Sequence, residues 1–387
     1  MFNIKTMNKI APAGLHRFTP GEFQCGDDIE TPDAFLVRSA ALHEVELPTS
    51  LKAIARAGAG VNNVPIDKCS DAGIVVFNTP GANANGVKEL VIGTMILASR
   101  NVIPATEWVK TLKGKGDEVP NLVEKGKKQF IGPELAGKKL GVIGLGAIGV
   151  RVANAARALD MDVYGYDPYL SVEAAWAISR DIYHASSLND IFQNCDYITI
   201  HVPLTPETRG LINAESIAAM KRGVRIFNLA RGDLAVSEDV AKGLQCGQVA
   251  SYVVDFPCDE LLDVPGVISI PHLGASTPES EENCATMAAS ELMDFLKYGI
   301  IRNSVNFPNV DLPISAAGRV TIIHKNKPTM LSQITACFAE ACINIENIID
   351  KSKKEMAYTI VDVSEERLDA VTDRLRALDG VIRVRVI

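Results

Sequence analysis

The chain has 387 residues, of which 47% are apolar and 22% charged, and it carries a formal net charge of −8. This length allows two or three domains with separate cores. The acidic balance and the lack of a basic run argue against nucleic-acid binding. We see neither a signal-peptide layout at the start nor an apolar run long enough to span a membrane.

The eight cysteines are scattered and form no CxxC pair. Such a pattern in a chain of this size predicts reduced thiols, a cytoplasmic location and no metal site.

Short apolar runs at 34–37, 52–57 and 74–77 are typical of strands, and a longer one at 87–99 predicts a buried helix. The segment 111–132 is rich in Lys and Gly, so we expect an exposed loop or a mobile connection there.

The centre of the chain contains six strand-like runs. Most of them are continuously apolar rather than alternating, as strands buried on both faces should be. Helix-like segments separate the first five, which predicts a parallel, doubly wound sheet. The six runs are 140–143, 162–166, 197–202, 225–229, 251–254 and 267–270.

The last part of the chain has a different pattern. The expected strands and helices there form a βαββαβ unit, which is large enough to fold alone. They are strand 320–324, helix 330–341, strands 343–349 and 357–363, helix 365–378 and strand 381–387.

A glycine motif, Gly144-Leu-Gly146-Ala-Ile-Gly149, follows the first central strand and opens a helix. Glycines at these places permit a tight turn, a close approach of the backbone to a pyrophosphate and tight helix packing. The helix N-terminus supplies free N–H groups for the phosphates. Asp167 ends the next strand, where an acid accepts hydrogen bonds from ribose hydroxyls and repels a 2′-phosphate, so NAD is favoured over NADP. As an alternative, Asp167 is only a turn residue.

Three reactive residues follow neighbouring strands of the expected sheet: Arg231, Asp255 and His272. Ligands bind at the carboxyl ends of parallel strands, so we expect all three on one rim. Oxidation of a 2-hydroxy acid requires a base for the hydroxyl proton, which suits His, and a cation for the carboxylate, which suits Arg. A carboxylate could orient the His ring, and Asp259 and Glu260 are the local candidates. Singly, each of these could be an ordinary loop residue.

GLGAIG, NLARGD, the acidic strand end and PHLGAST together resemble the D-isomer-specific 2-hydroxyacid dehydrogenases, and the tail resembles an ACT domain. The resemblance covers nearly the whole chain. It implies two doubly wound parallel-sheet domains, one of them a Rossmann domain, followed by a C-terminal βαββαβ regulatory domain. The implied boundaries are 1–86 with 275–311 for substrate, 87–274 for NAD and 312–387 for the ACT-like unit.

The resemblance implies a role for each matching residue. Arg231, His272 and Glu260 would be catalytic, with Asp259, or no carboxylate at all, as the alternative to Glu260. The implied NAD contacts are Gly144, Gly146, Ala147, Ile148, Gly149, Asp167, Pro168, Val202, Pro203, Ala230, Asp255 and Gly274. The implied substrate ligands, besides Arg231 and His272, are Arg38, Ser39, Gly60, Val61 and Asn83, with Arg38 supplying positive charge for a phosphate.

The implied reaction is NAD-dependent oxidation of 3-phospho-D-glycerate to 3-phosphohydroxypyruvate, the first step of phosphorylated L-serine biosynthesis, by a homodimer or homotetramer. Alternatives are another D-2-hydroxyacid dehydrogenase, such as a hydroxypyruvate or glyoxylate reductase, and a non-catalytic NAD-sensing regulator. In the tail, His324, Asn326 and Asn344 match positions that hold an L-serine effector. Thr329 stands where the family has a backbone-permissive Gly, which puts the shape of the effector loop in question. We still expect serine feedback, and the alternative is that the tail serves only for dimerisation.

Overall fold

The computed structural model describes residues 1–313, 318–365 and 368–387. In this part the chain forms two compact units, Met1–Asn83 with Glu281–Ile387, and Ala84–Ser280. The division into three domains stays a prediction. No helix among the described residues has both the length and the apolar character that a membrane span needs.

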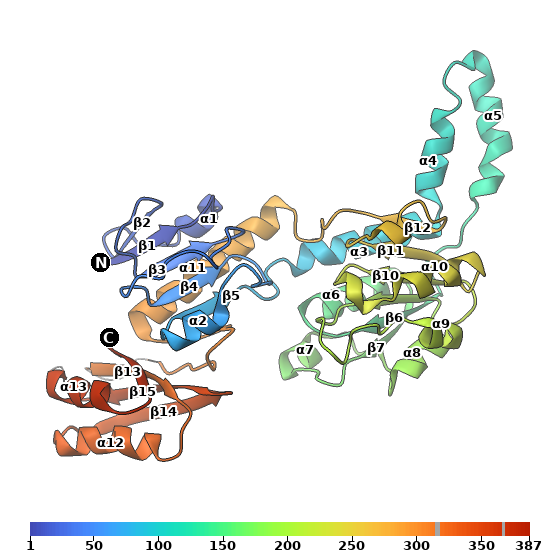
Figure 1. Cartoon of the computed structure of the whole chain (residues 1–387). Coiled ribbons are helices and arrows are strands. Elements are labelled where there is room, and N and C mark those ends of the chain that lie inside the picture. The colour runs from blue at the N-terminus through green and yellow to red at the C-terminus, as the bar shows by residue number, and fades with distance from the viewer. Residues whose placement is uncertain (314–317, 366–367) are drawn as a thin grey trace. The chain divides into compact units, whose positions relative to one another are not determined.

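The first unit contains a parallel sheet in the order β2-β1-β3-β4-β5 (Figure 1). The predicted strands 34–37, 52–57 and 74–77 are confirmed, whereas the first two strands of the sheet were not predicted. The strands are β1 (Phe2–Thr6), β2 (Phe23–Gly26), β3 (Ala34–Val37), β4 (Ala53–Arg56) and β5 (Val75–Asn78).

Helices cover both faces of this sheet. The long helix α11 (Pro278–Tyr298) packs on one face, where its Phe295 ring lies 5.7 Å from that of Phe77. On the other face, α2 (Ile66–Asp71) buries Cys69 against β3 and β5. The short helix α1 (Pro12–Leu15) lies beside α11.

The C-terminal part of the first unit is an antiparallel sheet in the order β14-β15-β13-β16, which confirms the predicted βαββαβ unit. The second helix begins at Asp369 rather than at 365, and residues 366–367 of the predicted helix lie outside the described residues. The elements are β13 (Gly318–Lys325), α12 (Met330–Glu340), β14 (Ile345–Lys353), β15 (Met356–Val363), α13 (Asp369–Ala377) and β16 (Val381–Val386).

The two faces of this C-terminal sheet are covered differently. Phe338 of α12 and Leu375 of α13 are buried on one face together with strand residues such as Val361. On the opposite face, Tyr358 and Ile360 belong to the same hydrophobic core as α11. Burial of each such large side chain contributes about 1.5–3 kcal/mol.

The second unit is built on a parallel sheet in the order β12-β11-β10-β9-β6-β7-β8. All six predicted central strands are present, and together with the first unit they confirm the predicted fold class. The strands are β6 (Lys139–Ile143), β7 (Asp162–Tyr166), β8 (Tyr183–His184), β9 (Tyr197–Ile200), β10 (Val224–Asn228), β11 (Val249–Val254) and β12 (Val267–Ser269).

Helices also cover both faces of this second sheet, so it is doubly wound. The helix predicted at 87–99 is α3 (Ala84–Ser99), which shares one face with α6 (Ala147–Arg157). The other face is covered by α8 (Leu188–Asn194), α9 (Ala214–Ala219) and α10 (Ser237–Gln245), while α7 (Val172–Ala177) follows β7. The strand order reverses between β6 and β9, and ligands of such sheets bind at that point, beside the carboxyl ends.

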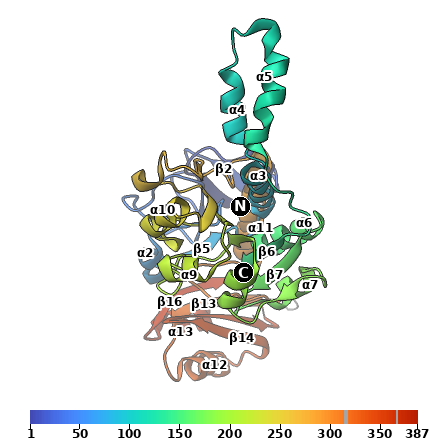
Figure 2. The ribbon, with the colours of Figure 1, turned by 90° about the vertical axis from the view of Figure 1, so that its right-hand side faces the viewer.

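The segment 111–132 is mostly exposed, as expected, but the expectation of a loop or mobile connection is wrong for 116–130, which are helical. The segment belongs to a helical hairpin of α4 (Val102–Lys110) and α5 (Val119–Gly126), flanked by the short 3-10 helices η1 (Gly116–Glu118) and η2 (Lys127–Phe130). Figures 1 and 2 both show the hairpin extending away from the sheet of its own unit. The Trp108 and Phe130 rings lie 5.4 Å apart and hold the hairpin together. Lysine is a good helix former, so its abundance signalled exposure rather than a loop.

Candidate active site

The glycine turn lies at the point where the strand order of the second unit reverses. Gly144 has φ +90, and a Cβ there would lie 2.7 Å from the carbonyl oxygen of His201, which follows β9. At Gly149 a Cβ would lie 1.9 Å from the Gly144 oxygen, so helix α6 could not approach the strand. A Cβ on Gly146 would meet no atom within 4 Å. The three glycines therefore have the structural properties of a dinucleotide-binding turn, with open space at the middle one.

Asp167 is placed at the end of β7, beside this turn. One carboxylate oxygen accepts a hydrogen bond of 2.8 Å from the Leu145 N–H, and the other accepts one of 2.8 Å from the Tyr169 N–H. Asp167 therefore acts as a turn residue and also lies beside the glycines. Each oxygen keeps a second lone pair, so the ribose role stays a prediction.

Arg231, Phe256 and His272 come together at the carboxyl ends of β10, β11 and β12. The Arg231 guanidinium carbon lies 5.6 Å from the centre of the Phe256 ring, and the Phe256 and His272 ring centres are 4.3 Å apart. The aromatic ring thus has the cation and the imidazole as its neighbours. Phe256 was not predicted from the motifs, although its place directly after Asp255 was the available signal.

The surroundings of His272 favour its neutral form. Partial burial lowers the pKa of the imidazole below its ordinary value, and the positive charge of Arg231 lowers it further. A neutral imidazole can accept a proton, so this environment suits a general base.

Asp255, at the end of β11, is a buried acid. Neither carboxylate oxygen has a hydrogen-bond partner from another described residue. Burial raises the pKa of the carboxyl to about 6, while the nearby Arg231 opposes the rise. Two unpartnered acceptors at this rim fit a ligand that brings N–H donors, such as the carboxamide of a nicotinamide.

Glu260 and Asp259, the two candidates for orienting His272, lie in the 3-10 helix η4 (Asp259–Leu261). The Glu260 side chain is exposed, and its backbone N–H and the Cys258 thiol lower the pKa of the carboxyl. Glu260 contacts its own loop, at its backbone N–H and at Cys258, and its orienting role toward His272 stays a prediction.

The other predicted cofactor residues lie at the carboxyl edge of the sheet, where open parallel sheets bind ligands. Ala147 and Ile148 form the first turn of α6, and the rest follow strand ends or lie in the loop after β12. Those residues are Pro168 after β7, Val202 and Pro203 after β9, Ala230 after β10 and Gly274. Their contacts with a cofactor stay predictions.

The predicted substrate residues of the first unit follow the carboxyl ends of its own sheet. Arg38 donates a hydrogen bond of 2.5 Å to the Glu281 carboxylate, and Ser39 accepts one of 3.4 Å from Asn8. Gly60 and Val61 follow β4, and Asn83 lies between β5 and α3, directly before the first residue of α3. The sequence analysis missed Arg56, which ends β4 and donates to the Arg38 carbonyl oxygen at 3.0 Å. An arginine that closes a strand was the available signal.

The predicted effector residues do not meet in one chain. His324 is 2% exposed, with Nε2 2.9 Å from Thr359 and 3.2 Å from Asp350. The pairing register places Asn326 and Asn344 at opposite ends of the C-terminal sheet. Thr329 has φ +66, so this position adopts the left-handed backbone that glycine favours.

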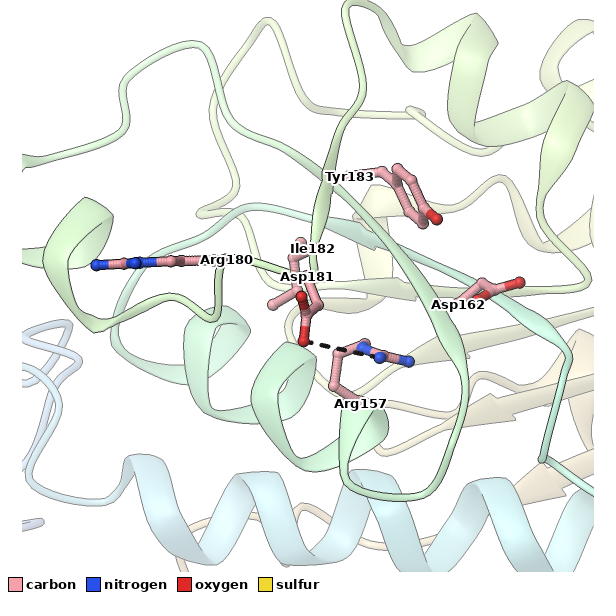
Figure 3. A pocket seen from close by; sticks show the side chains of 6 residues that line it. All are labelled: Arg157, Asp162, Arg180, Asp181, Ile182 and Tyr183. Atoms are coloured by element: carbon pink, nitrogen blue, oxygen red, sulfur yellow. Dashed lines mark ion pairs between the residues drawn. The ribbon is translucent and has the colours of Figure 1, made fainter.

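A hollow of about 360 Å³ lies elsewhere on the second unit (Figure 3). Asp162, the first residue of β7, and Arg157, the last of α6, line it, and Asp181 points toward Arg157. The hollow is therefore at the amino ends of the strands, away from the glycine turn.

The fold and this rim define a nucleotide-binding dehydrogenase, and the comparisons identify its family. Residues 92–274 match the model of the D-isomer specific 2-hydroxyacid dehydrogenase NAD binding domain, and residues 320–383 match an AHAS small subunit-like ACT domain. The chain belongs to the D-isomer-specific 2-hydroxyacid dehydrogenase family and carries its NAD-binding domain.

Several relatives carry the same name, D-3-phosphoglycerate dehydrogenase. D-3-phosphoglycerate dehydrogenase of Methanocaldococcus jannaschii is 37% identical over 73% of this chain and 53% of its own length. The enzyme of that name from Haemophilus influenzae is 32% identical over 85% of this chain and 79% of its own. The crystal structure of NAD+-bound 3-phosphoglycerate dehydrogenase of Entamoeba histolytica has a TM-score of 0.60 at 26% identity, covering 79% of this chain and 98% of that one. The chain spans little more than half the length of the first two curated relatives that it matches.

Proposed function

We propose that this protein oxidises 3-phosphoglycerate at C2 to 3-phosphohydroxypyruvate with NAD, as the first step of phosphorylated serine synthesis. The observation that carries the proposal is the placement of Arg231 and His272 around Phe256, on the rim that the glycine turn shares. The names of the relatives supply the substrate.

His272 takes the proton of the C2 hydroxyl, a task that suits its lowered pKa. Arg231 holds the substrate carboxylate and the oxygen that becomes the carbonyl, because its planar fork donates two parallel hydrogen bonds. When bound, NAD supplies the hydride acceptor. The glycine turn, the first turn of α6, Asp167 and Asp255 would hold it.

In the first unit, Arg38 and Ser39 are the proposed ligands of the substrate phosphate, with Gly60, Val61 and Asn83 beside them. Arg38 offers donors beyond the one that it gives to Glu281. An orienting role for Glu260 or Asp259 remains part of the proposal, as an alternative to His272 acting without a carboxylate.

The test is steady-state NADH formation with 3-phosphoglycerate and, separately, with unphosphorylated D-glycerate. We expect kcat/KM for the phosphorylated substrate to be at least tenfold higher, since a phosphate held by one arginine contributes roughly 1.5–3 kcal/mol. A preference for glycerate, glyoxylate or hydroxypyruvate would instead indicate a reductase of the same family. No turnover of any 2-hydroxy or 2-oxo acid would favour an NAD-sensing regulator.

We further propose a homo-oligomer that forms through the α4–α5 hairpin. Neither helix of the hairpin buries a residue within its own chain, and Val102, Ile103 and Val109 are exposed there. A second copy would cover this apolar surface. Sedimentation of the wild type against Val109→Glu, with Lys110→Glu as the matched control, tests the proposal: only Val109→Glu should shift the assembly toward monomer.

An L-serine effector at the C-terminal sheet is also proposed. Asn326 of one copy and Asn344 of another would have to meet for the site to form, because they lie at opposite ends of one sheet. Initial rates with added serine test this, and rates indifferent to serine would leave the ACT-like part structural. A cytoplasmic location is proposed because all eight cysteines are free thiols.

A further inference from the structure

Helix α11 connects two distant parts of the first unit. It is a single helix of 21 residues, so its ends are roughly 30 Å apart. Its first turns lie at the carboxyl ends of β3 and β4, and its last turn lies against the C-terminal sheet (Figure 1).

Near the beginning of α11, Glu281 forms an ion pair with Arg38. The carboxylate oxygen lies 2.5 Å from the guanidinium nitrogen, and the two side chains are 40% and 42% exposed. The backbone of Arg38 is fixed separately, because its N–H donates to Asn8 at 2.9 Å and its carbonyl accepts from Arg56 at 3.0 Å. Glu281 therefore holds the side chain of a residue whose backbone is already in place.

At the other end of α11, three strands of the C-terminal sheet hold the helix. Tyr358 of β15 donates to the Gly299 carbonyl at 2.7 Å, and Arg319 of β13 donates to that of Tyr298 at 2.8 Å. Arg385 of β16 donates to the Leu296 carbonyl at 2.9 Å. Cations and hydroxyl donors satisfy the free carbonyls at a helix end, so these contacts fix the position of α11.

We propose that Glu281 is an internal counter-ion of Arg38, which the anionic group of the substrate must displace, and that the C-terminal sheet holds this counter-ion in place through α11. Glu281 then acts on the reaction through Arg38 and is a positioning residue. The inference rests on the proposed function where it identifies the anion as the substrate phosphate.

The physical reason is competition for one guanidinium. Glu281 and a phosphate both seek the Arg38 donors, and their negative charges repel each other. An exposed ion pair changes an equilibrium constant by up to about fivefold, so loss of the carboxylate charge should strengthen anion binding by that order. Glutamine keeps the size of the side chain and an acceptor oxygen, so Arg38 keeps its neighbour without the competition.

The first experiment compares Glu281→Gln with Glu282→Gln, whose side chain is exposed on the same turn. We expect Glu281→Gln to lower KM for 3-phosphoglycerate about two- to fivefold, with kcat and the KM for NAD unchanged and KM for D-glycerate changed less than twofold. Glu282→Gln should match the wild type. An unchanged or raised KM for 3-phosphoglycerate in Glu281→Gln would overturn the proposal.

The second experiment tests the link through α11. Tyr358→Phe removes the hydroxyl that holds the helix end, and Tyr298→Phe removes a hydroxyl from the helix itself as a control. Tyr358→Phe should lower KM for 3-phosphoglycerate in the wild-type background and have no further effect beside Glu281→Gln. If the two effects multiply, as they do for independent sites, the link is refuted. Arg385→Lys serves the same cycle if Tyr358→Phe does not fold.

A third readout requires no turnover. The rate at which phenylglyoxal modifies Arg38, followed by peptide mass, should rise at least twofold in Glu281→Gln and stay constant in Glu282→Gln. An equal rate in all three proteins would overturn the counter-ion. A wild type that does not oxidise 3-phosphoglycerate would refute the proposed function alone, and the modification rates would still decide the role of Glu281.

Discussion

Gly146 is the position where cofactor binding and folding can be separated most cleanly. A Cβ there would meet no atom within 4 Å, and the backbone has φ −74 and ψ −163, which alanine adopts without strain. Gly146→Ala should gain about 0.4–1 kcal/mol from a less flexible unfolded chain and lose about as much because alanine is a poor N-cap. We therefore expect the free energy of unfolding to stay within about 1 kcal/mol of the wild type.

The cofactor should respond very differently to the same methyl group. If the open space at Gly146 admits the pyrophosphate, the methyl displaces it from the α6 N–H groups. Loss of one charge-assisted hydrogen bond costs about 1.5–3 kcal/mol, so Kd for NAD should rise roughly 10- to 100-fold.

Isothermal titration with NAD and urea unfolding measure the two quantities on the same samples. Gly149→Ala is the matched control, because its Cβ would lie 1.9 Å from the Gly144 oxygen and should destabilise the fold by about 1–3 kcal/mol or more. An NAD affinity within threefold of the wild type in Gly146→Ala would refute the assignment of the turn.

Three other predictions concern separate parts of the molecule. His272→Gln should lower kcat by about 10²–10⁴, and an unchanged kcat would exclude the role. In the wild type, kcat/KM should decline only below pH 6.5, because burial and Arg231 lower the pKa of the His272 imidazole. Burial raises the pKa of Glu291 to about 8, so the wild type should lose stability as pH rises from about 4.5 to 8. Glu291→Gln should remove that loss, so that its free energy of unfolding exceeds that of the wild type by about 2–4 kcal/mol at pH 9. Urea unfolding measures this, and a difference between the two proteins that does not change with pH would contradict the prediction. Thr329→Gly should raise the free energy of unfolding by up to about 1 kcal/mol because φ is +66 there, whereas destabilisation would show that the strain is absent.

The sequence alone determined the central sheet and its rim. Strands buried on both faces are apolar throughout, which located most of the six, although β7 and the edge strand β12 are only partly buried. Reactive residues directly after parallel strands had to share one edge. Arg231 and His272 could therefore be placed together although 40 positions of chain separate them. The glycine turn at Gly144 could be predicted equally well, because its conformation depends on residues that are adjacent in the sequence.

Only the tertiary structure decided which side chains face these residues. Glu281 lies 243 positions from Arg38, and no periodicity or motif indicates that α11 brings them together. The contact of Phe256 with both Arg231 and His272 likewise depends on how three loops fold back on the rim. The hairpin at 102–130 escaped prediction because lysine and glycine dominate much of its sequence and neither helix buries a residue within its own chain. Local patterns determine strands and turns, whereas the partner of each charge depends on packing between distant segments.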